Sequence, residues 1–103
     1  MKKSDFENAK QYFFETITKT KDEILQLKCR YLIGSILLEE GDLERAKSEF
    51  LAILEKDDSS SDAHYGLGLV LEKEGDIVKA RSEWRRALKS DPSHEKTREK
   101  LKA

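Results

Sequence analysis

The residues that could carry acid–base, nucleophilic or metal chemistry are few and scattered in this 103-residue sequence. The two histidines, His64 and His94, are 30 residues apart (94 − 64), and no cysteine or carboxylate pair joins them at metal-ligand spacing. Cys29 is the only cysteine, so an internal disulfide is impossible, and its apolar neighbours predict a small buried side chain rather than a reactive thiol. Because no catalytic set converges, we expect no enzyme, no metal and no cofactor.

Two short stretches resemble ligand-binding motifs. Residues 57–64, "DDSSSDAH", offer carboxylates and hydroxyls for a cation or a phosphate, but a polar loop that ends in a serine N-cap at Ser60 or Ser61 is the preferred interpretation. Residues 65–68, "YGLG", contain Gly-x-Gly inside an expected helix, without the strand and the Lys-Ser/Thr that accompany a phosphate loop. Neither stretch therefore predicts a site.

The composition predicts one folded domain over residues 1–103. Charged residues make up 40% and hydrophobic residues 37%, which is too apolar for a disordered chain. Lys plus Arg is 20 and Asp plus Glu is 21, so nothing favours nucleic acid or an anionic membrane. The start "MKKSD" is no signal peptide and no apolar run is long enough to span a membrane, so we expect a cytoplasmic protein.

A phrase of twelve residues occurs twice. "EEGDLERAKSEF" at residues 39–50 returns as "KEGDIVKARSEW" at residues 73–84, a shift of 34 (73 − 39). Its apolar residues recur at helical spacing. In each copy we expect Gly41 or Gly75 to end one helix in the left-handed conformation and Asp42 or Asp76 to cap the next. Helices are therefore predicted before these turns, over 27–40 and 61–74, and after them.

A period of 34 residues with two helices per period indicates a helical solenoid. The motif residues of the second copy are His64, Leu67, Gly68, Leu71, Ala80, Trp84 and Pro92. Those of the first copy are Arg30, Ile33, Gly34, Leu37, Ala46 and Phe50, with Asp58 in place of proline.

This pattern resembles the tetratricopeptide repeat, although both copies lack the opening aromatic residue and have leucine where tyrosine is usual. The resemblance implies close helix approach at the small residues, Gly34, Gly68, Ala46 and Ala80, with Phe50 and Trp84 filling the space between repeats. At the position of the missing aromatic, we expect His64 to be packed.

The segments before the first repeat and after the second repeat each resemble half of a repeat. Residues 5–17 mirror residues 42–54 at an offset of 37 (42 − 5), which leaves three extra residues in the first linker. A capping box from Thr20 to Glu23 predicts that the second helix begins early, near Lys21. The prediction is an all-α, right-handed solenoid of helical hairpins with about six helices. Its parts are an orphan second-type helix over 4–19, repeat one over 27–60, repeat two over 61–94 and a capping helix over 93–103.

The resemblance also implies a binding surface, because the first helix of each repeat lines a concave groove in this family. By alignment the groove residues are Lys28, Tyr31, Leu32, Ser35, Leu38, Glu39, Asp62, Tyr65, Gly66, Leu69, Glu72 and Lys73. The basic residues with which some family members hold a carboxylate terminus are absent. Instead the groove is apolar and aromatic, with Gly66 expected to leave room beside Tyr65, which favours an apolar or amphipathic protein segment as partner.

Two alternatives stay open. Tyr31 and Tyr65 can instead pack against neighbouring helices. Moreover, Tyr12 and Phe14 on the orphan helix would form an exposed aromatic patch, which predicts a structural scaffold or a homodimer as the alternative function.

Overall fold

The computed structural model describes residues 3–102, which form six α-helices and no β-strand. Met1, Lys2 and Ala103, the ends of the predicted 1–103 domain, lie outside the described residues. The helices are α1 (Lys3–Lys19), α2 (Glu23–Glu39), α3 (Leu43–Lys56), α4 (Ser61–Lys73), α5 (Ile77–Ser90) and α6 (Glu95–Lys102). The predicted all-α fold is confirmed.

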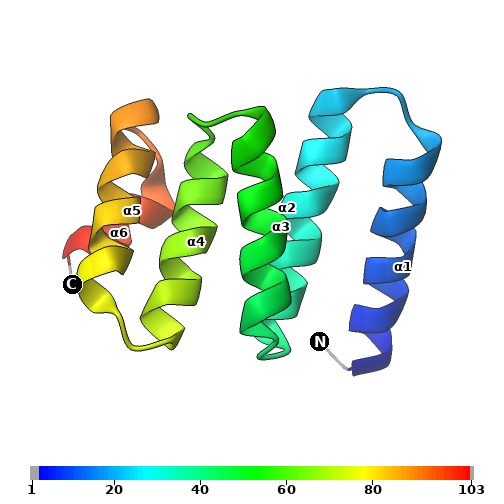
Figure 1. Cartoon of the computed structure of the whole chain (residues 1–103), viewed down its shortest axis with the longest axis horizontal. Coiled ribbons are helices and arrows are strands. Elements are labelled where there is room, and N and C mark those ends of the chain that lie inside the picture. The colour runs from blue at the N-terminus through cyan, green and yellow to red at the C-terminus, as the bar shows by residue number, and fades with distance from the viewer. Residues whose placement is uncertain (1–2, 103) are drawn as a thin grey trace.

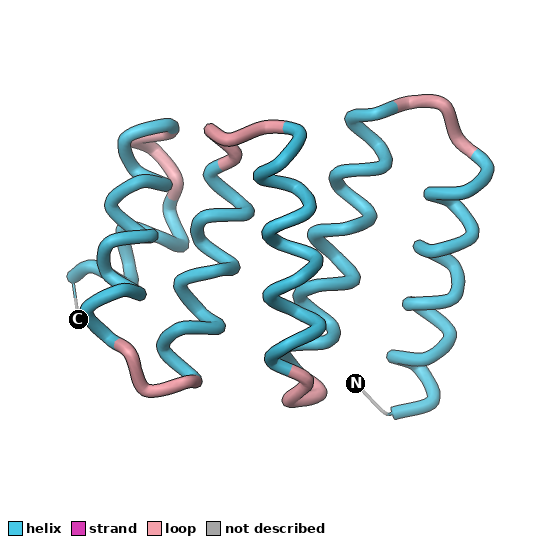
Figure 2. The backbone as a smooth tube through the Cα atoms, viewed as in Figure 1, coloured by secondary structure: helices cyan, strands magenta, loops and turns pink. Residues whose placement is uncertain are grey.

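The helices form a row of antiparallel neighbours, with α1 at one end and α6 beside α5 at the other (Figure 1). Each helix packs on the next, and α2 also contacts α4 across the intervening α3. Short loops join the helices at alternating ends (Figure 2). Consequently α2, α4 and α6 are first-type helices, whereas α1, α3 and α5 are second-type helices, as in a solenoid of helical hairpins.

The two Gly-Asp turns have the same geometry. Gly41 and Gly75 have positive φ angles of 82° and 89°, where an L side chain would be strained. The N–H of Asp42 donates to the Leu37 carbonyl at 2.9 Å, and the N–H of Gly41 donates to the Leu38 carbonyl at 3.0 Å, which is the Schellman pattern. The Asp42 and Asp76 side chains then cap α3 and α5 as predicted.

The start of α2 differs from the prediction. The N-cap is Asp22, whose carboxylate accepts from the N–H of Leu25 at 3.2 Å, and Thr20 Oγ1 accepts from the N–H of Asp22 at 3.1 Å. The expected Thr20–Glu23 capping box is therefore wrong, and α2 begins at Glu23 rather than near Lys21. Even so, α2 has 17 residues against 13 in α4, because the three extra linker residues join the helix and the loop before α2 is one residue shorter than the loop before α4.

The start of α6 also lies later than the prediction from residue 93. Asp91 Oδ1 accepts from both the N–H and the hydroxyl of Ser93, at 3.1 and 2.7 Å. This local turn holds Ser93 outside the helix, so α6 begins at Glu95. The same turn occurs one repeat earlier, where Asp57 binds Ser59 and Ser60 caps α4.

Two aromatic rings packed against glycine backbone form the centre of the core. Phe50 and Trp84 are 0% and 1% exposed. A Cβ atom at Gly34 would lie 2.8 Å from the Phe50 ring, and a Cβ atom at Gly68 would collide with Nε1 of Trp84. The predicted roles of Gly34 and Gly68 are confirmed, because each glycine lets a helix approach the ring more closely than any side chain would allow.

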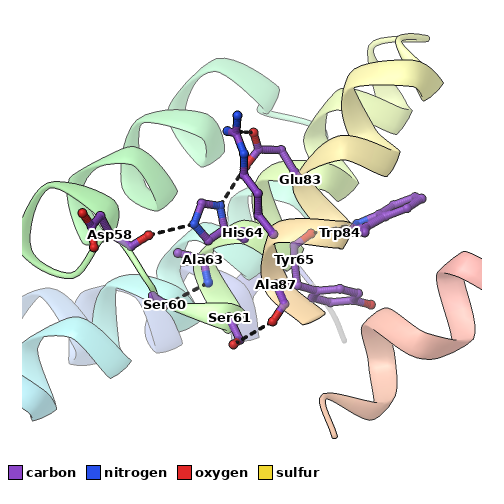
Figure 3. A network of polar contacts seen from close by, with 10 residues as sticks. Asp58, Ser60, Ser61, Ala63, His64, Tyr65, Glu83, Trp84 and Ala87 are labelled. Carbon is purple, nitrogen blue, oxygen red and sulfur yellow. Dashed lines mark hydrogen bonds and ion pairs between the residues drawn. The ribbon is translucent and has the colours of Figure 1, made fainter. Parts of the chain in front are cut away.

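Polar contacts between the two helices of each hairpin replace the opening aromatic residue of the repeat pattern. Arg30 donates to Glu49 at 3.0 Å between α2 and α3, and its counterpart His64 lies 2.8 Å from Glu83 between α4 and α5. His64 Nε2 is also 2.9 Å from the Asp58 carbonyl oxygen, so the ring links two helices and the preceding loop (Figure 3). The prediction that His64 is a packing residue is confirmed.

The contact between Gly68 and Trp84 gives a stability prediction. Gly68→Ala should lower the free energy of unfolding by roughly 1–3 kcal/mol, because the added methyl group overpacks a closed core. This sign is opposite to the usual gain when alanine replaces glycine in a helix. Urea unfolding followed by circular dichroism measures the change, with Ser82→Ala on the exposed face of α5 as the control. A Gly68→Ala protein as stable as its parent would contradict the packing described.

Candidate binding groove

A hollow of about 390 Å³ lies between the first-type helices α2 and α4, beside the end of α3. Its lining is mostly apolar on the α2 side and polar at the start of α4. The lining residues are Ile24, Leu27, Lys28, Tyr31, Leu32, Ile53, Asp57, Ser60 and Asp62. Four of them were predicted as groove residues from the sequence: Lys28, Tyr31, Leu32 and Asp62. We refer to this surface as the α2–α4 hollow.

Tyr31 connects the α2–α4 hollow to the core. Its ring lies 5.9 Å from the ring of Phe50, between centroids, and its side chain is half-buried. Burial, with a smaller contribution from the Asp62 carboxylate, raises the pKa of Tyr31 to about 12. The hydroxyl is therefore neutral at physiological pH. Tyr31 both packs on the core and lines the hollow, so helix packing and contact with a partner are compatible roles for this residue.

The remaining lining residues were missed by the alignment of the two repeats. Ile24 is 70% exposed and lies in the turn by which α2 exceeds α4, so it has no counterpart in repeat two. Asp57 and Ser60 belong to the loop before α4, where they were assigned to turn and cap formation only. The three extra linker residues were the available signal for Ile24, because they lengthen α2 into the groove.

Three of the predicted groove residues on α4, namely Asp62, Tyr65 and Glu72, contact side chains of α6. Lys100 donates to Glu72 at 2.8 and 3.1 Å, and its Nζ atom lies 5.3 Å from the centroid of the Trp84 ring. His94 Nε2 lies 2.7 Å from Asp62, and the ring of His94 is 5.5 Å from the ring of Tyr65. Consequently the structure concentrates the open groove around α2.

The prediction that Gly66 leaves room beside Tyr65 is wrong. Gly66 is buried, and a Cβ atom on it would lie 2.5 Å from the Phe50 ring. The glycine thus accommodates an internal aromatic ring instead of a ligand.

The other predicted groove residues lie outside the α2–α4 hollow. The hydroxyl of Ser35 donates to the carbonyl of Tyr31 at 2.9 Å, and Leu38 packs against the core. Leu69 is half-buried, whereas Glu39 and Lys73 are exposed at the ends of their helices. The predicted groove therefore divides into a hollow at the first half of α2, a segment in contact with α6 and two exposed helix ends.

Tyr12 and Phe14 do not form one patch on α1. Side chains two positions apart in a helix are about 200° apart around its axis. Tyr12, which is 65% exposed, borders a shallow hollow with Thr16 and Lys19, whereas Phe14, 38% exposed, borders another with Arg45 of α3. Tyr12 and Phe14 are therefore exposed on different flanks of α1, and their predicted role in self-association stays a prediction.

The histidine ring nitrogens all have polar partners. His64 contacts Glu83 and Asp58, and His94 contacts Asp62 and, at 2.8 Å, the hydroxyl of Thr97. Within residues 3–102 no group of three or more His, Cys, Asp or Glu side chains is placed to hold a metal ion. Cys29 is buried as predicted, and burial raises the pKa of its thiol. None of the helices described has the length and apolar character needed to cross a membrane.

The pKa of Tyr31 predicts a pH dependence of stability. The pKa of an unfolded tyrosine is about 10, whereas the pKa of Tyr31 in the folded protein is about 12. Between these values the unfolded state binds fewer protons, so stability falls as pH rises. Tyr31→Phe keeps the ring and should reduce that fall, as measured by urea unfolding across the alkaline range. Equal losses in parent and variant would contradict the burial of the hydroxyl.

Comparison with known proteins agrees with the repeat geometry. No curated protein matches the chain. A family model described as tetratricopeptide repeat matches residues 31–95, more than half of the 103 residues. Repeats of this family generally mediate protein–protein interactions and are typically non-catalytic. The structure has two complete helical hairpins whose aromatic rings pack against helical glycines. Together with this match, they show that the chain belongs to the tetratricopeptide repeat family.

Proposed function

We propose that this chain is a protein-interaction module that holds an apolar or amphipathic segment of a partner protein in the α2–α4 hollow. The observation that supports this most is the exposure of large apolar side chains at one concave site. Ile24 and Leu32 are 70% and 41% exposed, and both line the hollow. Exposed apolar residues that gather around a hollow, rather than occur singly, are typical of an interaction site.

The dimensions of the hollow suit a side chain from a protein partner. A volume of about 390 Å³ is near the lower end of the range for ligand pockets. Tyr31 supplies a rigid, half-buried wall with a neutral hydroxyl, the kind of surface that often anchors an interface. We therefore expect the partner to insert one or two large apolar side chains against Tyr31 and Leu32.

The charges at the edges of the hollow orient the partner. Lys28 lies on α2, Asp57 is the C-cap of α3, and Asp62 lies in the first turn of α4. One oxygen of Asp62 contacts His94 at 2.7 Å, but the side chain is 62% exposed, so its other oxygen can meet a basic group on a partner. Because the carboxylates outnumber the single lysine, the hollow suits an apolar segment with an adjacent basic residue better than a free carboxyl terminus.

Self-association through α1 is the alternative function, and the structure supports it less. Tyr12 and Phe14 lie on different flanks of α1, so one two-fold interface would bury only one of them.

Variants at the hollow test the proposal. Peptides selected from a displayed random library for binding to the parent protein should carry large apolar residues. Ile24→Ser combined with Leu32→Ser should weaken their binding at least about tenfold, because the partner loses two apolar contacts. Ile24 and Leu32 are 70% and 41% exposed and neither belongs to the buried core, so the fold should persist in circular dichroism. Fluorescence anisotropy with the selected peptides measures the affinity.

A matched pair of substitutions provides the control. Leu51→Ser combined with Val78→Ser also removes two exposed apolar side chains, on α3 and α5, and neither residue lines the hollow. This control should bind the peptides as the parent does. If the hollow variant retains full affinity, or if the control loses as much, the binding site lies elsewhere.

A further inference from the structure

The N-terminal helix α1 exposes a side that is buried in the other second-type helices. Its residues Ala9, Phe13 and Thr16 correspond to Ala46, Phe50 and Ile53 in α3, at an offset of 37, and to Ala80, Trp84 and Ala87 in α5. The six residues in α3 and α5 are between 0% and 3% exposed. The three residues in α1 are all only partly buried. Within residues 3–102, the element that covers this side of α3 and of α5 therefore has no counterpart over α1.

The covering element in both complete repeats is the preceding first-type helix. Glu49 and Glu83, whose side chains are 17% and 12% exposed, contact Arg30 of α2 and His64 of α4. The corresponding residue of α1 is Tyr12 (12 + 37 = 49), which is 65% exposed. We define the open side of α1 as Ala9, Tyr12, Phe13 and Thr16. In α3 and α5, the corresponding residues contact the first-type helix of the same repeat.

The repeats also indicate what chemistry this other half needs. Above Phe50 and Trp84 the first-type helix carries Gly34 and Gly68, because any side chain would collide with the ring. Phe13 has the place of these two rings in α1. The occupant therefore needs a glycine, or at most a very small residue, where it crosses Phe13.

The edge of the open side offers an aromatic face and a carboxylate to a cation. Tyr12 replaces the glutamate of the other repeats, and Glu15, one turn further along α1, borders the same shallow hollow as Tyr12, together with Lys19. Glu15 also accepts from Gln11 on α1 at 3.3 Å. An arginine at the position of Arg30 would meet the face of Tyr12 and the carboxylate of Glu15 together. Gly34 follows Arg30 by four residues in α2. A single helix can therefore place an arginine beside Tyr12 and a glycine over Phe13.

We propose that the open side of α1 binds an amphipathic helix of a partner protein with the pattern Arg-x2-Leu-Gly, whose arginine contacts Tyr12 and Glu15 and whose glycine crosses Phe13. This surface is separate from the α2–α4 hollow, and the inference does not depend on the function proposed for the hollow.

A second copy of the chain fits the open side poorly. Its helices α2 and α4 are packed inside their own hairpins. Its terminal helix α6 offers Arg98 and Leu101 at the right spacing, but Lys102 stands where glycine is required (68 + 34 = 102). The Cβ atom of Lys102 would therefore meet the ring of Phe13 as a Cβ atom at Gly68 would meet Trp84.

A synthetic helix tests the inference on the full chain. The probe is a peptide with the sequence of residues 60–74 that carries His64→Arg, so that it contains Arg-x2-Leu-Gly. Titrated into isotope-labelled protein, it should shift the amide NMR signals of Ala9, Phe13 and Thr16 in α1. The same peptide with Gly68→Leu should bind at least about tenfold more weakly, because its side chain collides with Phe13.

Two protein variants separate the open side from the rest of α1. Tyr12→Ala should weaken the peptide at least about fivefold, whereas Phe14→Ala, on the other flank, should leave its affinity unchanged. Shifts confined to residues outside α1, or equal affinity of the glycine and leucine peptides, would overturn the inference. Sedimentation that detects a dimer dispersed by Tyr12→Ala would overturn it as well, because the occupant would then be a second copy.

Discussion

The contact between an aromatic ring and helical glycine backbone is the constraint on which the rest of this structure depends. Phe50 lies between Gly34 of its own hairpin and Gly66 of the next one, and Trp84 lies against Gly68. Because the glycines have no Cβ, the first-type helices come close to the rings and leave them almost fully buried. The spacing between hairpins, and with it the hollow between α2 and α4, follows from these contacts.

The two ends of the row satisfy this constraint differently. At the C-terminal end the position equivalent to Gly66 is Lys100, whose ammonium group lies over the Trp84 ring and pairs with Glu72. A charged helix thus closes the core toward water. At the other end, Phe13 packs against the core on the α2 side, no first-type helix precedes α1 within residues 3–102, and its side chain stays partly exposed. This asymmetry makes α1, rather than α6, the end suited to a further helix.

Small departures from the repeat determine where the binding surface lies. Three extra residues in the first linker lengthen α2 by nearly a turn and place Ile24 at the edge of the hollow. On α4, Asp62 and Glu72 contact His94 and Lys100 of α6 instead. A regular array would instead present similar surfaces on α2 and α4. The candidate site is accordingly local to the first complete repeat.

The sequence by itself determined the period, the helical hairpins, the Gly-Asp turns and the glycines that pack against Phe50 and Trp84. These features depend on local geometry that recurs every 34 residues. The resemblance to the family, aligned on the repeat pattern, also pointed to Lys28, Tyr31, Leu32 and Asp62, which line the hollow. Only the tertiary structure decided that Gly66 faces Phe50, that His94 of α6 contacts Tyr65, and that Ile53, Asp57 and Ser60 join the hollow. These facts depend on how neighbouring hairpins approach one another, and that approach is set by side-chain volumes from different repeats rather than by spacing along the chain.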